Sequence, residues 1–264
     1  MTDAFWFLLT TGAAVAMTMM VAVWFLARWF NNAGIVDVAW ALGFAVLAGI
    51  YFLIGEGDPT RRLLICGMAG LWGARLGIYL WIRVSRHHPE EDGRYATLRE
   101  QYPRNTWLMF FGFFQLQAVL LAVLSAPFAM AASNPNAGIS TWEWAGVALW
   151  LVAMLGEALA DWQLHEFRSV PENKGRTCRI GLWRASRHPN YFFEWLIWVA
   201  YFVFALGSPD GWMTFFCPAL MLFFLFKVTG IPATEAQAVK SRGDEYREYQ
   251  RTTSVFVPWF PKKS

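Results

Sequence analysis

Seven long stretches of uncharged, mostly apolar residues constrain the fold of this 264-residue chain more than any other feature. A helix needs about 20 such residues to cross the hydrocarbon core of a bilayer. Each stretch approaches that length once it is extended through one or two polar residues, and no soluble core requires seven of them. We therefore predict an all-α integral membrane protein with seven transmembrane helices. The stretches cover residues 4–27, 38–55, 63–74, 107–132, 145–156, 195–209 and 211–226.

The basic residues are distributed unevenly between the segments that join these stretches. With the N-terminus outside, 19 of the 22 lysines and arginines fall on the inner side; Arg61 and Arg62 fall outside, and Arg75 lies within a span. Cytoplasmic segments of membrane proteins carry such an excess of positive charge. We therefore expect the N-terminus outside and the C-terminus in the cytoplasm. No nucleic-acid partner is needed to explain the basic residues.

The whole chain, residues 1–264, is predicted to form a single membrane domain, because it shows neither repeats nor low-complexity linkers. The three cysteines have no metal-binding spacing, and two of them, Cys66 and Cys217, fall within spans, where they act as small apolar residues. The loop from His87 to Tyr95 mixes histidines with acids. A metal site there is conceivable, but adjacent histidines match no tetrahedral spacing, and a solvated loop is the favoured interpretation. We expect no metal.

Cationic, acidic and hydrogen-bonding groups gather directly before the apolar segment 195–206. Charge near a membrane span is costly and usually indicates a functional site. This group suits an anionic ligand that enters from water and reaches toward the lipid. Its members are Arg184, Arg187, His188, Asn190, Tyr191 and Glu194.

A second polar group follows helical spacing at the inner end of the fifth span. Asp161 and Arg168 follow Glu157 by four and eleven residues. The three side chains therefore share one helix face and can point into one pocket. The alternative is an Asp–Arg pair that only holds the helix end. Asp37 is either a site residue or an N-cap, and Arg75 needs an acidic partner, for which Asp37 or Glu194 is available.

Five segments together resemble the steroid 5-alpha-reductase superfamily, in particular its bacterial branch long described as a domain of unknown function. The resemblance covers most of the chain. The matching segments are Asn32…Val36-Asp37…Trp40, Trp72-Gly73…Arg75-Leu76-Gly77 with Glu91-Asp92…Arg94-Tyr95, Glu157…Asp161…Gln163…Phe167-Arg168, Gly181-Leu182-Trp183…Ser186-Arg187-His188-Pro189-Asn190-Tyr191…Glu194, and Gly230-Ile231-Pro232…Glu235…Tyr246…Tyr249…Pro258-Trp259-Phe260-Pro261.

The resemblance implies seven transmembrane helices and NADPH bound on the cytoplasmic side by the part of the chain from about residue 145 to 264. Arg179, Arg187 and His188 are expected near the phosphates, and Glu194 near the nicotinamide. The cofactor-binding residues that it implies are Glu157, Asp161, Arg168, Arg176, Arg179, Arg187, His188, Asn190, Tyr191 and Tyr246.

The chain departs from the steroid-reducing members at two positions. Those members use a Glu and a Tyr to hold the substrate carbonyl and assist protonation, and by segment order Asp37 and Trp72 stand in their places. An indole donates a hydrogen bond but cannot act as a general acid. The proton would then come from Asp37 or from a tyrosine such as Tyr79 or Tyr191. The expected catalytic residues are Asp37, Trp72, Tyr191 and Glu194.

Two functions from different classes fit these patterns. The first is an NADPH-dependent reductase of a lipid-soluble substrate, acting at a carbon–carbon double bond of a steroid, an isoprenoid or another lipid. The second is a membrane methyltransferase of the isoprenylcysteine carboxyl or phospholipid type that uses S-adenosylmethionine. The excess of arginines favours the reductase. Positive side chains suit the several phosphates of NADPH better than the cationic sulfur of S-adenosylmethionine. We expect a monomer in the bacterial inner membrane, surrounded by membrane lipids.

Overall fold

The computed structural model describes residues 1–88, 90–228 and 230–262, and within them every regular element is helical. Pro89 of the expected solvated loop and Lys263 of the expected inner tail lie outside the described residues. The chain folds as two compact units. Unit 1 comprises residues 1–143 and 204–214, and unit 2 comprises residues 144–203 and 215–264.

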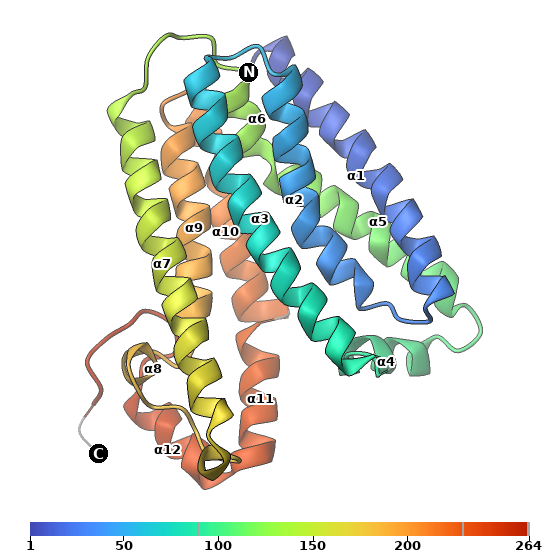
Figure 1. Ribbon diagram of the computed structural model, residues 1–264, viewed down its shortest axis with the longest axis vertical. Helices are drawn as coiled ribbons and strands as arrows, with labels where there is room; N and C mark the ends of the chain where they lie inside the picture. Colours follow the sequence, from blue (N-terminus) through green and yellow to red (C-terminus); the bar gives the residue numbers. More distant parts are fainter. Residues whose placement is uncertain (89, 229, 263–264) are drawn as a thin grey trace. The chain divides into compact units, whose positions relative to one another are not determined.

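Unit 1 is a bundle of apolar helices in which α2 lies antiparallel beside α3, and α1 packs against α2 and α5 (Figure 1). Its core contains aromatic rings such as Phe44 and Phe128, whose centroids are 6.2 Å apart. The helices are α1 (Asp3–Trp29), α2 (Ile35–Ile54), α3 (Pro59–His87), α4 (Gly93–Gln101), α5 (Thr106–Leu124) and α6 (Ala126–Ala132).

Two glycines let α2 and α3 approach each other closely. A Cβ atom on Gly73 would lie 2.7 Å from the carbonyl oxygen of Ala41, and one on Gly77 would lie 2.5 Å from Leu42. The two glycines are four residues apart on α3 and therefore lie on one face of the helix. Small residues at this spacing are typical of close helix packing in membranes. The pairing fixes the position of Asp37, which lies in the first turn of α2.

A buried ion pair lies at the end of unit 1 that contains the α2–α3 turn. The Arg61 guanidinium donates to the Glu143 carboxylate, and the two side chains are 2% and 0% exposed. Arg61 also donates to the carbonyl oxygens of Asn134 at 2.9 Å and Gly138 at 2.6 Å. Glu143 caps the start of α7, accepting from the Ser140 amide at 2.6 Å. Burying both charges is costly, and these hydrogen bonds offset part of that cost.

Unit 2 is built on the long helices α7 and α9, with α10, α11 and α12 following α9 along the chain (Figure 1). The Trp150 indole on α7 donates to the Tyr201 hydroxyl on α9 at 3.2 Å, and the Trp195 indole on α9 donates to the Pro218 carbonyl on α10 at 3.0 Å. The elements are α7 (Thr141–Ser169), η1 (Pro171–Asn173), α8 (Leu182–Ala185), α9 (Pro189–Ala205), η2 (Gly211–Phe215), α10 (Phe216–Phe223), the π-helical η3 (Phe224–Val228), α11 (Ile231–Arg242) and α12 (Asp244–Thr252). The start of α7, the end of α9 and all of η2 except Phe215 belong to unit 1.

Within the described residues, six helices are long and apolar enough to cross a membrane, which gives the chain the composition of an integral membrane protein. These candidate spans are Asp3–Trp29, Ile35–Ile54, Pro59–Arg86, Thr106–Leu124, Thr141–Ser169 and Gly211–Arg242. The last of them contains η2, α10, η3 and α11. The sixth expected span corresponds to α9, which has 17 residues and is shorter than the usual length of about 20. Many large apolar side chains are exposed, such as Leu53 at 76% and Leu155 at 70%, as expected for surfaces that face lipid.

One detail differs from the sequence-based expectation. The stretch 107–132 is divided at Ser125 into α5 and α6, because Pro127 in the first turn of α6 begins a new helix. Two further breaks shape the polar segments. Gly243, which has a φ of 57°, separates α11 from α12, and α4 begins at the N-cap Asp92 in the segment between α3 and α5.

Candidate functional site

The clearest meeting of predicted site residues lies in unit 2, between α7 and the start of α9. The Asn190 side-chain amide donates to the Asp161 carboxylate at 3.2 Å. Glu157 is one turn away from Asp161 on α7 and is 5% exposed. Both α9 and α7 contribute to the contact because the ring of Phe193 packs directly against Gly156. The structure therefore brings the two groups predicted from separate motifs into one place.

The motif Gly181-Leu182-Trp183 has a structural role in holding α8 against α7. Gly181 has a φ of 52°, in the left-handed region that favours glycine, and a Cβ there would collide with the Gln163 side chain. The Gln163 side-chain oxygen accepts from the Leu182 amide at 2.8 Å, and the Trp183 indole donates to the Ala160 carbonyl at 2.9 Å. These bonds position the turn that follows α8 and leads into α9 at Pro189.

Arg187, which the resemblance implies near the cofactor phosphates, is held by other residues of the chain. Its guanidinium donates to Glu235 at 2.6 Å and to the carbonyls of Gln250 and Thr253, each at 2.8 Å. His188 lies 3.2 Å from the same Glu235 oxygen. A carboxylate 48 residues further along the chain therefore holds this arginine in place, and Arg187 joins the α8–α9 turn to α11 and α12.

His188 and Tyr191 form a stacked pair at the start of α9. The ring centroids are 5.4 Å apart and the planes differ by 6°. His188 is 3% exposed, whereas the Tyr191 hydroxyl reaches an exposed position 3.3 Å from the Thr234 hydroxyl. The buried imidazole fixes the orientation of the tyrosine ring, so the phenol is the group of this pair that a ligand can reach.

The remaining predicted basic residues divide into two groups. Arg168 and Arg176 are exposed, and in the part of the chain that the structure describes, no hydrogen bond or ion pair holds either guanidinium. Arg179 donates to the Glu245 carbonyl at 2.7 Å and lies 5.3 Å from the centre of the Tyr249 ring. The first two can turn toward an anion, whereas Arg179 is partly held.

Tyr246 is placed in the packing between α11 and α12. It is 4% exposed, its ring lies 5.7 Å from that of Tyr249, and the Arg242 guanidinium lies 4.9 Å from its centre. Burial and the nearby Glu235 carboxylate raise the pKa of Tyr246 to about 12. The geometry assigns this residue a packing contact, and its cofactor role stays a prediction.

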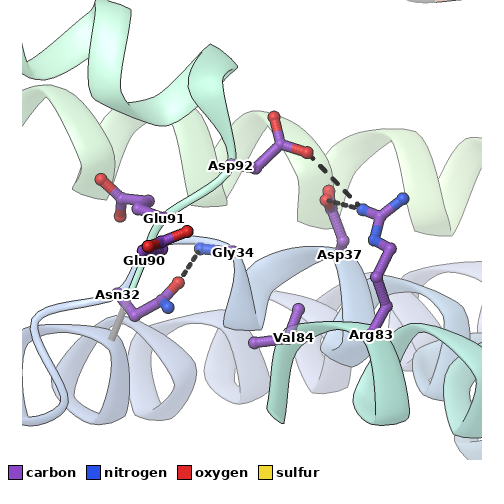
Figure 2. Close-up of a pocket in the computed structure, with 8 residues that line it drawn as sticks. All are labelled: Asn32, Gly34, Asp37, Arg83, Val84, Glu90, Glu91 and Asp92. Atoms are coloured by element: carbon purple, nitrogen blue, oxygen red, sulfur yellow. Dashed lines mark hydrogen bonds and ion pairs between the residues drawn. The ribbon is translucent and has the colours of Figure 1, made fainter. Parts of the chain in front are cut away.

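Two of the predicted catalytic residues, Asp37 and Trp72, lie in unit 1, where Asp37 lines a cavity of about 210 Å³. Figure 2 shows Arg83 facing both Asp37 and Asp92, at N–O distances of 3.8 and 3.7 Å. Carboxylates outnumber guanidinium groups around this cavity, so it suits a cationic or neutral polar group better than a phosphate. The lining residues are Asn32, Gly34, Asp37, Arg83, Val84, Glu90, Glu91 and Asp92.

Asp37 is held by α4 rather than exposed for substrate alone. The Tyr95 hydroxyl donates to it at 2.7 Å and the Arg94 guanidinium at 2.8 Å. Burial and the adjacent Asp37 carboxylate raise the pKa of Tyr95 well above its ordinary value. Burial alone would lower the pKa of Arg94, but the charges of Asp37 and Asp92 more than offset this and raise it. Asp37 is therefore the common acceptor that fastens α4 to the end of α2.

Trp72 lies in the core of unit 1. It is 0% exposed, and its ring centre is 5.3 Å from that of Phe44 on α2. Glu194 is half-buried on α9, one turn beyond Asn190. Within the described residues, no three His, Cys, Asp or Glu side chains gather as metal ligands, and the thiols of Cys66, Cys178 and Cys217 are buried.

Two structural residues of these sites carried little sequence signal. Glu235 belongs to the resembling tail, but nothing in its neighbourhood indicates Arg187 as its partner. Gln163 lies between Asp161 and Arg168 and interacts with a loop that begins 18 residues later.

The family model that matches this chain covers residues 23–253 and bears the description "Protein of unknown function (DUF1295)". The chain belongs to the DUF1295 family. The match includes every predicted site residue from Asp37 to Tyr246. The uncharacterized protein C594.04c of Schizosaccharomyces pombe (strain 972 / ATCC 24843) is 26% identical over 277 residues, which cover 94% of this chain and 78% of that protein. No solved structure matches the chain significantly.

Proposed function

We propose that this member of the DUF1295 family is an NADPH-dependent reductase of a lipid-soluble substrate, with a carbon–carbon double bond of a steroid, an isoprenoid or another lipid as the bond reduced. The proposal keeps the resemblance to the steroid 5-alpha-reductase superfamily and adds the geometry of unit 2. The observation that carries it is the Asn190–Asp161 hydrogen bond of 3.2 Å.

This hydrogen bond fits a binding site better than a purely structural contact. Two residues from separate sequence motifs meet at the point where α7 and α9 lie together, beside the buried Glu157. An amide and a carboxylate provide both a donor and an acceptor for the amide and hydroxyl groups of a nucleotide. In the proposal, Asp161 and Asn190 bind and orient the nucleoside portion of the cofactor.

The basic residues nearby supply the charge that phosphates require. Arg168, Arg176 and Arg184 are exposed, and no described residue forms a hydrogen bond or ion pair with their guanidinium groups. Each charge-assisted contact with a phosphate contributes roughly 1.5–3 kcal/mol. Arg187 has a different part in the proposal: it holds the turn from which Asn190 projects.

NADPH, when bound, supplies a hydride, and the chain must supply orientation and a proton. Trp72 cannot give the proton, and Asp37 already accepts hydrogen bonds from Tyr95 and Arg94. Tyr191 has a hydroxyl that a ligand can reach and a ring held by His188. We assign the proton donor to Tyr191, with Glu194 one turn deeper on the same helix as a positioning residue.

The proposal includes the membrane arrangement. Six spans come from the helices named above, and α9 is the seventh, because its polar start at Asn190 is followed by an apolar run. The uneven distribution of basic residues places the N-terminus outside and the C-terminus in the cytoplasm. We propose the bacterial inner membrane as the location and a monomer as the working unit.

The test is to identify the nucleotide that co-purifies with the detergent-solubilised protein, by mass spectrometry of the released ligand. The proposal expects NADPH or NADP⁺ from the wild type and markedly less from Asp161→Asn. Asp244→Asn is the control, because its side chain is 95% exposed at the start of α12. Recovery of S-adenosylmethionine instead would favour the methyltransferase.

A further inference from the structure

The last described residues of the chain present large apolar side chains outward. Trp259 is 69% exposed, Phe260 is 85% exposed and Val257 is 52% exposed. The neighbouring Phe256 is 6% exposed and belongs to the core of unit 2. The segment therefore has an inner side that packs and an outer side that meets its surroundings. A contiguous group of exposed large apolar residues indicates an interaction surface.

The outward residues are carried on a backbone that is held in place. The Trp259 amide donates to the Ala185 carbonyl at 2.9 Å, and the Lys262 amide donates to the Thr252 carbonyl at 2.8 Å. Just before them, the Ser186 hydroxyl donates to the Phe256 carbonyl at 2.7 Å. These bonds fix the segment against the α8–α9 turn, so the exposed rings have a defined position.

The inner side of the segment shows how deep it lies relative to α9. The ring of Phe256 is 5.6 Å from that of Phe192, 5.8 Å from that of Trp195 and 5.1 Å from that of Phe226. Since α9 begins at Pro189 and rises about 1.5 Å per residue, Phe192 and Trp195 lie about 5 and 9 Å along it. The segment therefore runs beside the first two turns of an apolar helix. In a spanning helix, those turns lie at the boundary between headgroups and acyl chains.

The chemistry of the segment matches that boundary. Tryptophan is enriched at membrane–water interfaces, where an apolar ring and an N–H donor are both satisfied. Arg184 and Lys262 are exposed beside the rings and can meet anionic headgroups. A protein partner would need an apolar groove at the same depth, whereas lipid is present there already.

We infer that residues 257–262 form an interfacial anchor that inserts Trp259 and Phe260 into the headgroup–acyl boundary of the leaflet where α9 begins. The anchor ties α12 and the tail to the membrane surface. Its depth rests on the crossing of α9 in the proposed function and not on the reductase chemistry.

The experiment places an environment-sensitive fluorophore at Phe260→Cys in the full-length protein reconstituted into phospholipid nanodiscs. Labelling is selective because the three native cysteines are buried. Phe260→Cys replaces a side chain that is 85% exposed and has a ring contact with its neighbour Trp259, and Val257→Cys provides a second label on the outer side. Asp244→Cys is the matched control in water, since Asp244 is 95% exposed. Quenching is measured with phospholipids brominated near the headgroup and with aqueous iodide.

The anchor predicts that the labels at positions 260 and 257 are quenched several-fold more by brominated lipid than the label at position 244, and much less by iodide. Equal iodide quenching at positions 260 and 244, without lipid quenching, would overturn the inference. Protection of position 260 from both quenchers would also overturn it, because the segment would then be covered by protein.

Discussion

The Asn190 side-chain amide donates to the Asp161 carboxylate at 3.2 Å, joining the first turn of α9 to the polar face of α7. Twenty-nine residues separate the two in the chain. The pair unites the two motifs on which the reductase proposal depends, so its variants test the proposal more sharply than any single surface arginine.

Asp161→Asn and Asn190→Ala should each weaken NADPH binding about tenfold or more, the effect of losing one hydrogen bond to a charged or polar ligand group. Neither change should lower the thermal unfolding temperature by more than a few degrees, because both side chains are only partly buried. Binding is measured by isothermal titration and unfolding by intrinsic fluorescence. A variant that loses stability but keeps nucleotide affinity would assign the pair a structural role.

Arg61→Met should destabilise unit 1 by about 3–5 kcal/mol, because it leaves the Glu143 carboxylate buried without its partner. The double variant Arg61→Met/Glu143→Gln should be more stable than the single variant, since no unpaired charge remains. Thermal unfolding in detergent compares the three proteins. If the double variant is the less stable, the cost arises from lost packing of Arg61 and not from the orphaned charge.

Acid should weaken the attachment of α4. Burial alone would raise the pKa of Asp92, but the hydrogen bonds from Arg94 and the charges of Arg94 and Arg83 lower it. A carboxyl whose pKa is lower when folded stabilises the protein above its ordinary pKa of about 3.9, and that contribution is lost as pH falls through the folded value.

Wild type should therefore exceed Asp92→Asn in stability at pH 7 by less than about 1 kcal/mol, because Asp92 is 35% exposed and its charges are screened. The difference should shrink in the most acidic samples, where Asp92 begins to bind a proton. Hydrogen exchange at α4, followed from pH 7 to pH 3, measures it. A difference that persists unchanged at pH 3 would mean that ionisation of Asp92 contributes nothing.

Membrane topology is tested by reporter fusions after Asn136 and at the C-terminus. The distribution of basic residues and the assignment of α9 as a seventh span predict that the two reporters lie on opposite sides. Reporters on the same side would show that α9 does not cross, consistent with its 17 residues.

The sequence predicted the all-helical fold because apolar stretches long enough for spans are a strong signal. The sequence could not predict which polar side chains of different motifs contact each other. The resemblance implied Arg187 near the phosphates, but it gave no sign that Glu235 on α11 binds this arginine. Gly243 separates α11 from α12 because its φ is positive. The good helix formers around it hide this break in the sequence.

The candidate site was predicted in part. Helical spacing placed Glu157 and Asp161 on one face, and the motif around Asn190 indicated a polar helix start. Asp161 and Asn190 face each other because Phe193 packs against Gly156. That contact depends on the fold and not on the local sequence pattern. The partners of Asp37 were missed for the same reason, since Tyr95 lies 58 residues away.

The most direct test of the central claim is titration of the purified protein in nanodiscs with NADPH, NADH and S-adenosylmethionine. The account predicts that NADPH binds at least about tenfold more tightly than NADH, because exposed arginines meet its additional phosphate with charge-assisted bonds of roughly 1.5–3 kcal/mol each. Equal affinity for the two nucleotides, or binding of S-adenosylmethionine alone, would contradict it.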